Sequence, residues 1–131
     1  MVTIIAILAA AIPAVTAGIP AMRLRAEAAR LSETMRQAHD DAIRQGIDME
    51  IVFDPAALRY VVLPANAARD MAPAVDRLEL AVDAVMHAEH TMRVRFFGDG
   101  SATGAMVRLW HGKRSNAITV DWLTGRVVEH D

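Results

Sequence analysis

Hydrophobic and polar positions divide the N-terminal third of the chain into two different helical patterns. Residues 1–22 contain no charged side chain, whereas residues 23–46 alternate between apolar and charged positions. In the second segment the apolar residues recur at spacings of four and three, which places them on one face of a helix. This stripe consists of Leu24, Ala28, Leu31, Met35, Ala38 and Ala42. Gly46 is a residue that commonly ends a helix, so we predict one helix of about 45 residues.

The uncharged segment is long enough for a membrane span. At ~1.5 Å per residue, residues 1–22 would reach ~33 Å as a helix, which exceeds the ~30 Å hydrocarbon core of a bilayer. We therefore predict a transmembrane or polymerisation helix over residues 1–22 and an amphipathic helix over residues 23–46. The amphipathic half is expected to lie against a small domain.

Beyond Gly46 the hydrophobic period changes from helical to two, as in β-strands. Strands are predicted over residues 49–53, 59–63, 77–82, 92–97, 105–110, 116–121 and 127–130. Residues 64–76 are rich in alanine and proline and are predicted to form a surface loop, and residues 83–91 fit either a helical turn or a loop. Short turns between successive strands favour antiparallel pairing. The fold class is therefore α+β, with an antiparallel sheet domain over residues 47–131 and the helical stripe covering one sheet face.

Charge and cysteine content narrow the class of partners. The net charge is −2 and the pI is about 6.2, which argues against a general binder of polyanions. Basic residues nevertheless outnumber acidic ones, six to four, within residues 92–131. The chain contains no cysteine, so an exported domain would depend on packing alone.

Three features resemble the minor pseudopilins of type II secretion, specifically the general secretion pathway protein H family. The first is the order of an apolar helix, an amphipathic continuation and a β domain. The second is RFFGDGSATG at residues 95–104, which is similar to the family's strand and following turn. The third is VDWLTGRV at residues 120–127, which is similar to its closing hairpin. The resemblance covers nearly the whole chain and implies a pilin-like fold.

The resemblance also implies a role and a location. Such proteins are single-pass inner-membrane subunits with a periplasmic head, and they later join a pseudopilus that helps export folded proteins through the outer membrane. The implied partners are other major and minor pseudopilins, the inner membrane and the secreted protein. Residues expected to pack in the helix are Ile4, Ile5, Ile7, Leu8, Ile12 and Pro13. Exposed turns expected to contact partners contain Asp99, Gly100, Ser101, Thr103, Gly104, Asp121, Trp122, Thr124, Gly125 and Arg126.

Family members begin with a basic leader that a prepilin peptidase removes before methylating the new N-terminus. The leader and the Phe-Thr-Leu-x-x-Glu segment that follows it are absent from this sequence, and Met1 is expected to fall a few residues into the mature helix. The peptidase is therefore an expected partner only of a precursor that carries the leader. With no basic residue before the uncharged run, Arg23 and Arg25 alone would favour a cytoplasmic head, but we expect the family's orientation.

No residue pattern predicts catalysis, a cofactor or a metal. His87 and His90 flank Glu89 at a spacing that does not match the zinc hydrolase motif, and the single histidines His39, His111 and His130 are expected at the surface. Asp99-Gly100-Ser101 lacks the further carboxylates of a calcium loop and is interpreted as a hairpin turn. Asp40 and Asp41 point in different directions on a helix and are interpreted as a solvated face.

Two other classes of function remain open from the sequence. A minor pilin of a type IV pilus or DNA-uptake system could use basic residues and tryptophans near the C-terminus to bind nucleic acid, although the acidic last residues argue against this. The residues concerned are Arg93, Arg95, Arg108, Lys113, Arg114 and Arg126, with Trp110 and Trp122. A secreted domain cleaved after Val15-Thr16-Ala17 is disfavoured, because no basic segment precedes the apolar run.

Overall fold

The computed structural model describes residues 2–82 and 93–130 and contains one long helix and two β-sheets. Helix α1 spans Val2–Gln45. The strands among the described residues are β1 (Met49–Asp54), β2 (Arg59–Leu63), β3 (Ala67–Asp70), β4 (Arg77–Val82), β5 (Arg93–Phe96), β6 (Ala105–His111), β7 (Arg114–Val120) and β8 (Val127–His130). The predicted pilin-like α+β class is confirmed. Residues 83–91, whose structure the sequence left ambiguous, lie outside the described residues.

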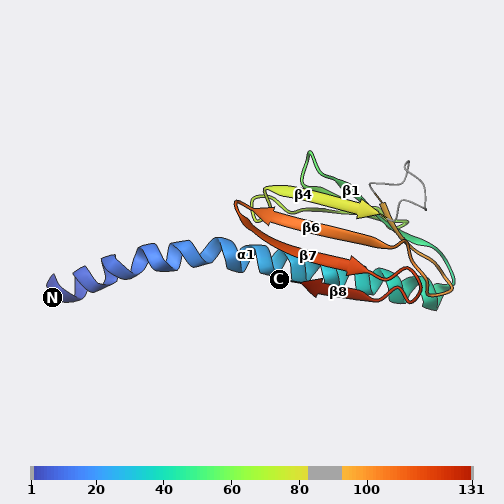
Figure 1. Cartoon of the computed structure of the whole chain (residues 1–131), viewed down its shortest axis with the longest axis horizontal. Helices are drawn as coiled ribbons and strands as arrows, with labels where there is room; N and C mark the ends of the chain where they lie inside the picture. Colours follow the sequence, from blue (N-terminus) through green and yellow to red (C-terminus); the bar gives the residue numbers. More distant parts are fainter. Residues whose placement is uncertain (1, 83–92, 131) are drawn as a thin grey trace.

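Helix α1 has an N-terminal part that extends beyond the strands and a C-terminal part that packs on them (Figure 1). All six stripe residues, from Leu24 to Ala42, are at most 2% exposed. The helix ends where Gly46 adopts a positive φ of 64° and Ile47 N donates to the carbonyl of Ala42 at 3.2 Å. Packing of one helical face, rather than helix propensity alone, therefore holds residues 24–42 in place.

No helix within the described residues carries an apolar stretch long enough to cross a bilayer. The side chains of residues 1–17, on which most of the predicted span falls, lie outside the described part of the structure.

The strands form two antiparallel sheets, where the sequence predicted one. The order is β3-β2-β1-β5 in the first sheet and β4-β6-β7-β8 in the second. Ile51 of β1 pairs with Val94 of β5, and Val107 of β6 pairs with Ile118 of β7. All four side chains are fully buried. The division arises because the chain leaves the first sheet after β3, forms β4 elsewhere, and returns to it at β5.

Strand β3 lies within the segment that the sequence predicted to be a loop. Asn66 adopts a positive φ of 59°, and the chain reverses there so that Ala67–Asp70 pairs with β2. β3 is an edge strand whose residues are mostly exposed, so its sequence carries no alternating hydrophobic pattern. The loop prediction was wrong for this reason.

One core joins the helix to both sheets. Met35 from the helix, Ile51 and Phe96 from the first sheet, and Leu109 and Ile118 from the second are all inaccessible to solvent. Burial of each such side chain contributes about 1.5–3 kcal/mol of hydrophobic free energy. The two sheets and the helix therefore form a single head rather than separate units.

A buried ion pair fixes the helix against β3. Glu27 is only 7% exposed, and its two carboxylate oxygens accept from Arg69 Nε and Nη2 at 3.2 and 3.3 Å. Arg30, one turn along the helix, lies 3.6 Å from the same carboxylate. The charge of Glu27 is thus compensated where it enters the protein interior.

Candidate functional site

The first of the two sequence motifs folds as a turn after β5. Gly100 N donates to the carbonyl of Phe97 at 3.0 Å, and Phe97 N donates to the carbonyl of Ser101 at 2.9 Å. Asp99 Oδ1 accepts from the amide and the hydroxyl of Ser101 at 2.9 and 2.6 Å. These donors lower the pKa of the Asp99 carboxyl below its ordinary value. The aspartate therefore shapes the turn through its own neighbour, which is the structural role that the sequence predicted for Asp99-Gly100-Ser101.

The second motif folds as the turn between β7 and β8. Asp121 N donates to the carbonyl of Arg126, and Gly125 N donates to the carbonyl of Asp121, both at 2.9 Å. Asp121 Oδ1 accepts from the amides of Leu123 and Thr124 at 2.8 and 3.2 Å. Gly125 adopts a φ of 71°, which disfavours a side chain. An aspartate at the start and a glycine near the end thus define this turn.

The two turns contact each other and the C-terminal half of α1. Ala102 N donates to the carbonyl of Trp122 at 2.9 Å, and His39 Nε2 lies 2.9 Å from the carbonyl oxygen of Gly100. Because a carbonyl can only accept, Nε2 carries the proton in this contact. Gly125 lies against both partners, since a Cβ there would overlap the His39 ring and lie 2.7 Å from the Gly100 oxygen. We call residues 98–104 and 121–126 the turn pair.

The turn pair presents apolar side chains to solvent. Trp122 is 60% exposed and Leu123 is 62% exposed. Ile43 of the helix is also about half exposed, and it lies beside Gly100. Large apolar side chains gathered at one exposed place are typical of interaction surfaces. This end of the head therefore has the character of a contact site for another protein.

The sequence expected all of these turn residues to be exposed, and this is wrong for two of them. Thr103 is buried, with its amide donating to the carbonyl of Arg95 at 2.8 Å and its hydroxyl accepting from Arg95 N at 3.3 Å. Gly125 is buried beneath His39. Both residues hold the turns in place and are not available to a partner.

Comparison with known proteins identifies the class of molecule that carries this turn pair. A family model described as "Type II transport protein GspH" matches residues 27–124, which include both turns up to Thr124. The chain belongs to this GspH family. It is accordingly a minor pseudopilin of type II secretion, a structural and non-enzymatic class of protein.

Individual relatives agree with the family. Type II secretion system protein H from Xanthomonas campestris pv. campestris is 28% identical over 127 residues, covering 97% of this chain and 73% of the relative. The minor pseudopilin EpsH of Vibrio cholerae has the same fold, with a TM-score of 0.67 and 10% identity over 82% of this chain and 95% of EpsH. The type IV minor pilin FimU of Pseudomonas aeruginosa is also similar, with a TM-score of 0.62 and 13% identity over 82% of this chain and 88% of FimU. The fold is thus shared by both classes, while the sequence match selects the GspH family.

The histidines of this GspH-family chain are placed differently from one another. His39 was expected at the surface, but it is largely enclosed between the turn pair and the Phe96 ring, whose centroid is 5.9 Å away. His111 is partly buried, and of the three histidines that the structure describes only His130 is exposed. His87, Glu89 and His90 lie outside the described residues. Among the residues that the structure describes, no cluster of three potential metal ligands is found.

Several of the basic residues near the C-terminus are engaged by other side chains of the head. Arg93 and Arg95 both form ion pairs with Glu50, the former at 3.3 Å. The guanidinium of Arg77 lies 4.4 Å from the centroid of the Trp110 ring. The guanidinium of Arg77 therefore occupies a face of the Trp110 ring on which a nucleic-acid base would otherwise stack.

Sequence reasoning missed the contributions of His39 and Ile43 to the site. Ile43 lies outside the apolar stripe and gave no periodic signal, although an apolar residue on a charged helical face is itself a hint of an interface. The six predicted helix-packing residues between Ile4 and Pro13 have side chains outside the described part of the structure.

Proposed function

We propose that residues 1–22 of this GspH-family chain anchor it in the bacterial inner membrane and later pack among sister helices in the pseudopilus. Residues 23–46 would continue the same rod, and residues 47–131 would form a periplasmic head. The observation that supports this division is the continuity of α1 over Val2–Gln45, whose N-terminal part extends beyond the strands (Figure 1). Within the described side chains, the head buries the helical stripe over residues 24–42. The part of the helix that extends beyond the head would be available to contact lipid or the helices of other pseudopilins.

The composition of the extending part supports both environments. Residues 1–22 carry no charge, and Ile4, Ile5, Ile7, Leu8, Ile12 and Pro13 make them apolar without a polar face. Such a segment is compatible with lipid and equally with the apolar helices of other pseudopilins. In this proposal prepilin peptidase acts on a precursor that carries the leader, and the assembled fibre helps folded proteins to leave through the outer membrane.

We assign the turn pair to contacts with a neighbouring pseudopilin. Trp122 and Leu123 are exposed side by side in the turn that Asp121 and Gly125 hold in shape. Large aromatic residues on a rigid turn lose little conformational entropy on binding and often dominate interface energies. Asp99, Ser101 and Arg126 lie in the same pair of turns and would form the polar rim of this surface.

Secretion by the full chain tests the anchoring proposal. In a bacterium that lacks its own protein H, the chain expressed as a precursor that carries the leader should restore export of folded proteins. Ile7→Arg in this precursor should abolish export because a central arginine costs about 2.5–3.5 kcal/mol on membrane insertion. Ile7→Leu is the matched control and should retain export. Export that survives Ile7→Arg would count against the proposed role of residues 1–22.

Orientation and contacts are testable with single cysteines, because the chain has none of its own. Ala56→Cys, at the exposed β1–β2 turn, should react with a membrane-impermeant maleimide added to the periplasmic side. Trp122→Cys should form cross-links to another pseudopilin, whereas Ala56→Cys should not. An unlabelled Ala56→Cys in an intact membrane would place the head in the cytoplasm and refute the orientation.

The alternative is a minor pilin that binds DNA. The fold similarity to FimU is compatible with a type IV pilin, but Arg93 and Arg95 are already paired with Glu50. A titration with duplex DNA at low and moderate salt separates the classes, because phosphate contacts weaken steeply with salt. We expect no salt-sensitive binding.

A further inference from the structure

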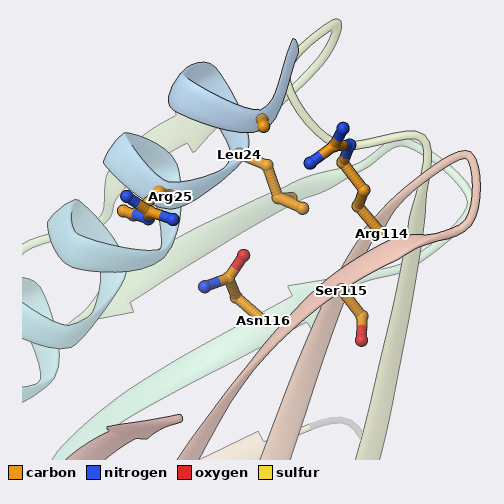
Figure 2. Close-up of a pocket in the computed structure, with 6 residues that line it drawn as sticks. Leu24, Arg25, Arg114, Ser115 and Asn116 are labelled. Carbon is orange, nitrogen blue, oxygen red and sulfur yellow. The ribbon is translucent and has the colours of Figure 1, made fainter. Parts of the chain in front are cut away.

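Two arginines share a cavity at the end of the head where the uncharged part of the helix enters it, and another cation lies one or two residues before each of them in the sequence. Arg25 of α1 and Arg114 of β7 line one cavity of about 200 Å³ together with Ser115 and Asn116. Figure 2 shows the two arginines reaching it from the helix and from the β6–β7 hairpin, with Leu24 between them. Arg23 precedes Leu24 and Lys113 precedes Arg114, and both are exposed. Two segments about 90 residues apart in sequence thus contribute to one basic surface, which we call the basic collar.

Neighbouring contacts hold the hairpin in position. His111 pairs with Arg114, so that Gly112 and Lys113 alone form the turn, and Gly112 adopts a φ of 61°. Gly112 N donates to Asp76 Oδ2 at 2.7 Å, which ties the hairpin to the residue before β4. The collar is therefore presented by a fixed turn and a helix rather than by a free loop.

Among the residues that the structure describes, no carboxylate neutralises the cations of the collar. Most other arginines on the head have a carboxylate partner, such as Glu50 for Arg93. In the described parts of the chain, no carboxylate lies within 4 Å of Arg23, Arg25, Lys113 or Arg114 in an ion pair. The collar therefore retains charge for an external anion.

We propose that the basic collar binds the anionic phospholipid headgroups of the bilayer that holds residues 1–22. This inference rests on the membrane anchoring proposed above. Arg23 and Arg25 follow the uncharged run by one and three residues, or about 1.5–4.5 Å along the helix. The headgroup layer on each side of the hydrocarbon core is about 5–7 Å thick. If the run fills the core, the collar reaches the level of the phosphates.

The opposite end of the head cannot reach this level. His39 and the turn pair lie fourteen residues beyond Arg25 on the same helix, a rise of about 21 Å. Attraction to an anionic surface contributes roughly a fivefold change in binding per Lys or Arg near it. The collar would therefore hold the head down against the membrane before assembly and leave the turn pair accessible to a partner.

Energy transfer from tryptophan to a headgroup probe tests the proposal on the full chain. The protein is reconstituted in vesicles of phosphatidylcholine, with or without phosphatidylglycerol, that contain the same density of a dansyl-labelled lipid. In the Trp122→Phe variant the remaining tryptophan is Trp110, which pairs with Ser115 next to the hairpin and therefore reports from the collar. In Trp110→Phe the remaining tryptophan reports from the turn pair.

We expect transfer from Trp110 to rise when phosphatidylglycerol is present, and transfer from Trp122 to change little. This rise in energy transfer from Trp110 should disappear in 1 M salt, where the Debye length is about 3 Å instead of about 10 Å in 0.1 M salt. Arg25→Gln with Arg114→Gln should weaken the surface-bound state of the head by about 25-fold. Arg44→Gln with Arg126→Gln, which removes the same charge from the other end, should leave the rise intact.

The outcomes separate the collar from the anchor. Co-flotation of the chain with both kinds of vesicle, without a lipid-dependent rise, overturns the collar proposal and leaves anchoring standing. Co-flotation with neither vesicle overturns both. Co-flotation with anionic vesicles only supports the collar and refutes an anchor formed by residues 1–22. If the rise in energy transfer from Trp110 persists in Arg25→Gln/Arg114→Gln, the proposal is also overturned. If this double variant then also shows reduced cross-linking between subunits, the collar binds an acidic protein neighbour instead.

Discussion

A methyl group at position 125 should disrupt the contact between the two turns and the helix. Gly125 has a φ of 71°, and a Cβ there would overlap His39 and lie 2.7 Å from the backbone oxygen of Gly100. The left-handed conformation costs a non-glycine residue about 1–2 kcal/mol, and overpacking of a closed contact costs about 1–3 kcal/mol more. We expect Gly125→Ala to lower the free energy of unfolding by about 2–5 kcal/mol, a large share of a typical ~5–15 kcal/mol.

Gly112→Ala provides the matched control. Gly112 has a similar φ of 61°, but no atom lies within 4 Å of its would-be Cβ. We expect Gly112→Ala to lower the free energy of unfolding only by the cost of the left-handed conformation, about 1–2 kcal/mol. Urea unfolding of the full chain in detergent, followed by near-ultraviolet circular dichroism, measures both variants. Equal destabilisation by Gly125→Ala and Gly112→Ala would refute the reasoning that the turn pair closes on Gly125.

A second variant separates the two obstacles to the methyl group. His39→Ala removes the imidazole but leaves the Gly100 carbonyl in place. Because the two positions are in contact, the combined loss in His39→Ala/Gly125→Ala should be smaller than the sum of the single losses, by about 0.5–3 kcal/mol. Strict additivity would mean that His39 does not limit the space at Gly125.

Three further predictions concern stability and ionisation. Arg69→Gln should lower the free energy of unfolding in urea by about 1–3 kcal/mol, because it leaves the buried carboxylate of Glu27 without its main partner. Arg59→Gln, at an exposed ion pair, should lower it by less than about 1 kcal/mol. Equal losses in the two variants would contradict the role given to burial. Burial raises the pKa of Tyr60, the chain's single tyrosine, above its ordinary value, so its ultraviolet titration should have a midpoint above pH 10 that falls in denaturant. The folded form binds this proton more tightly, so stability should be full below pH 10 and decline as the pH rises through the folded pKa. Asp121→Ala should cost about 1–3 kcal/mol, since two backbone amides lose their acceptor, and Asp121→Asn should retain most of that stability.

The two ends of the head differ in chemistry. The end near residues 1–22 carries Arg25 and Arg114, which have no carboxylate partner among the described residues, together with the exposed Met22. The far end carries the exposed apolar side chains of Trp122 and Leu123. A subunit that moves from a bilayer into a fibre would require different contacts at its two ends. The proposed collar and the turn pair assign one such contact to each end.

The sequence by itself determined the local elements of this protein. The stripe from Leu24 to Ala42 repeats with a helical period because one helix face is buried over residues 24–42. Most strands show a period of two because one sheet face is buried. Gly46 and Gly125 mark a helix end and a turn because both need a positive φ. The two C-terminal motifs, together with the order of the apolar helix, its amphipathic continuation and the β domain, indicated the family.

Only the tertiary structure decided which elements meet. Hydrophobic periodicity indicates that a face is buried but not which element covers it, so the division into two sheets could not be predicted. Edge strand β3 has no buried face, so its sequence has no periodic pattern from which it could be predicted. His39 is enclosed because two turns, about 60 and 86 residues away in sequence, close over it. Arg25 and Arg114 share a cavity for the same reason. These contacts depend on how the faces of distant elements fit together, and a local sequence pattern contains no information about that fit.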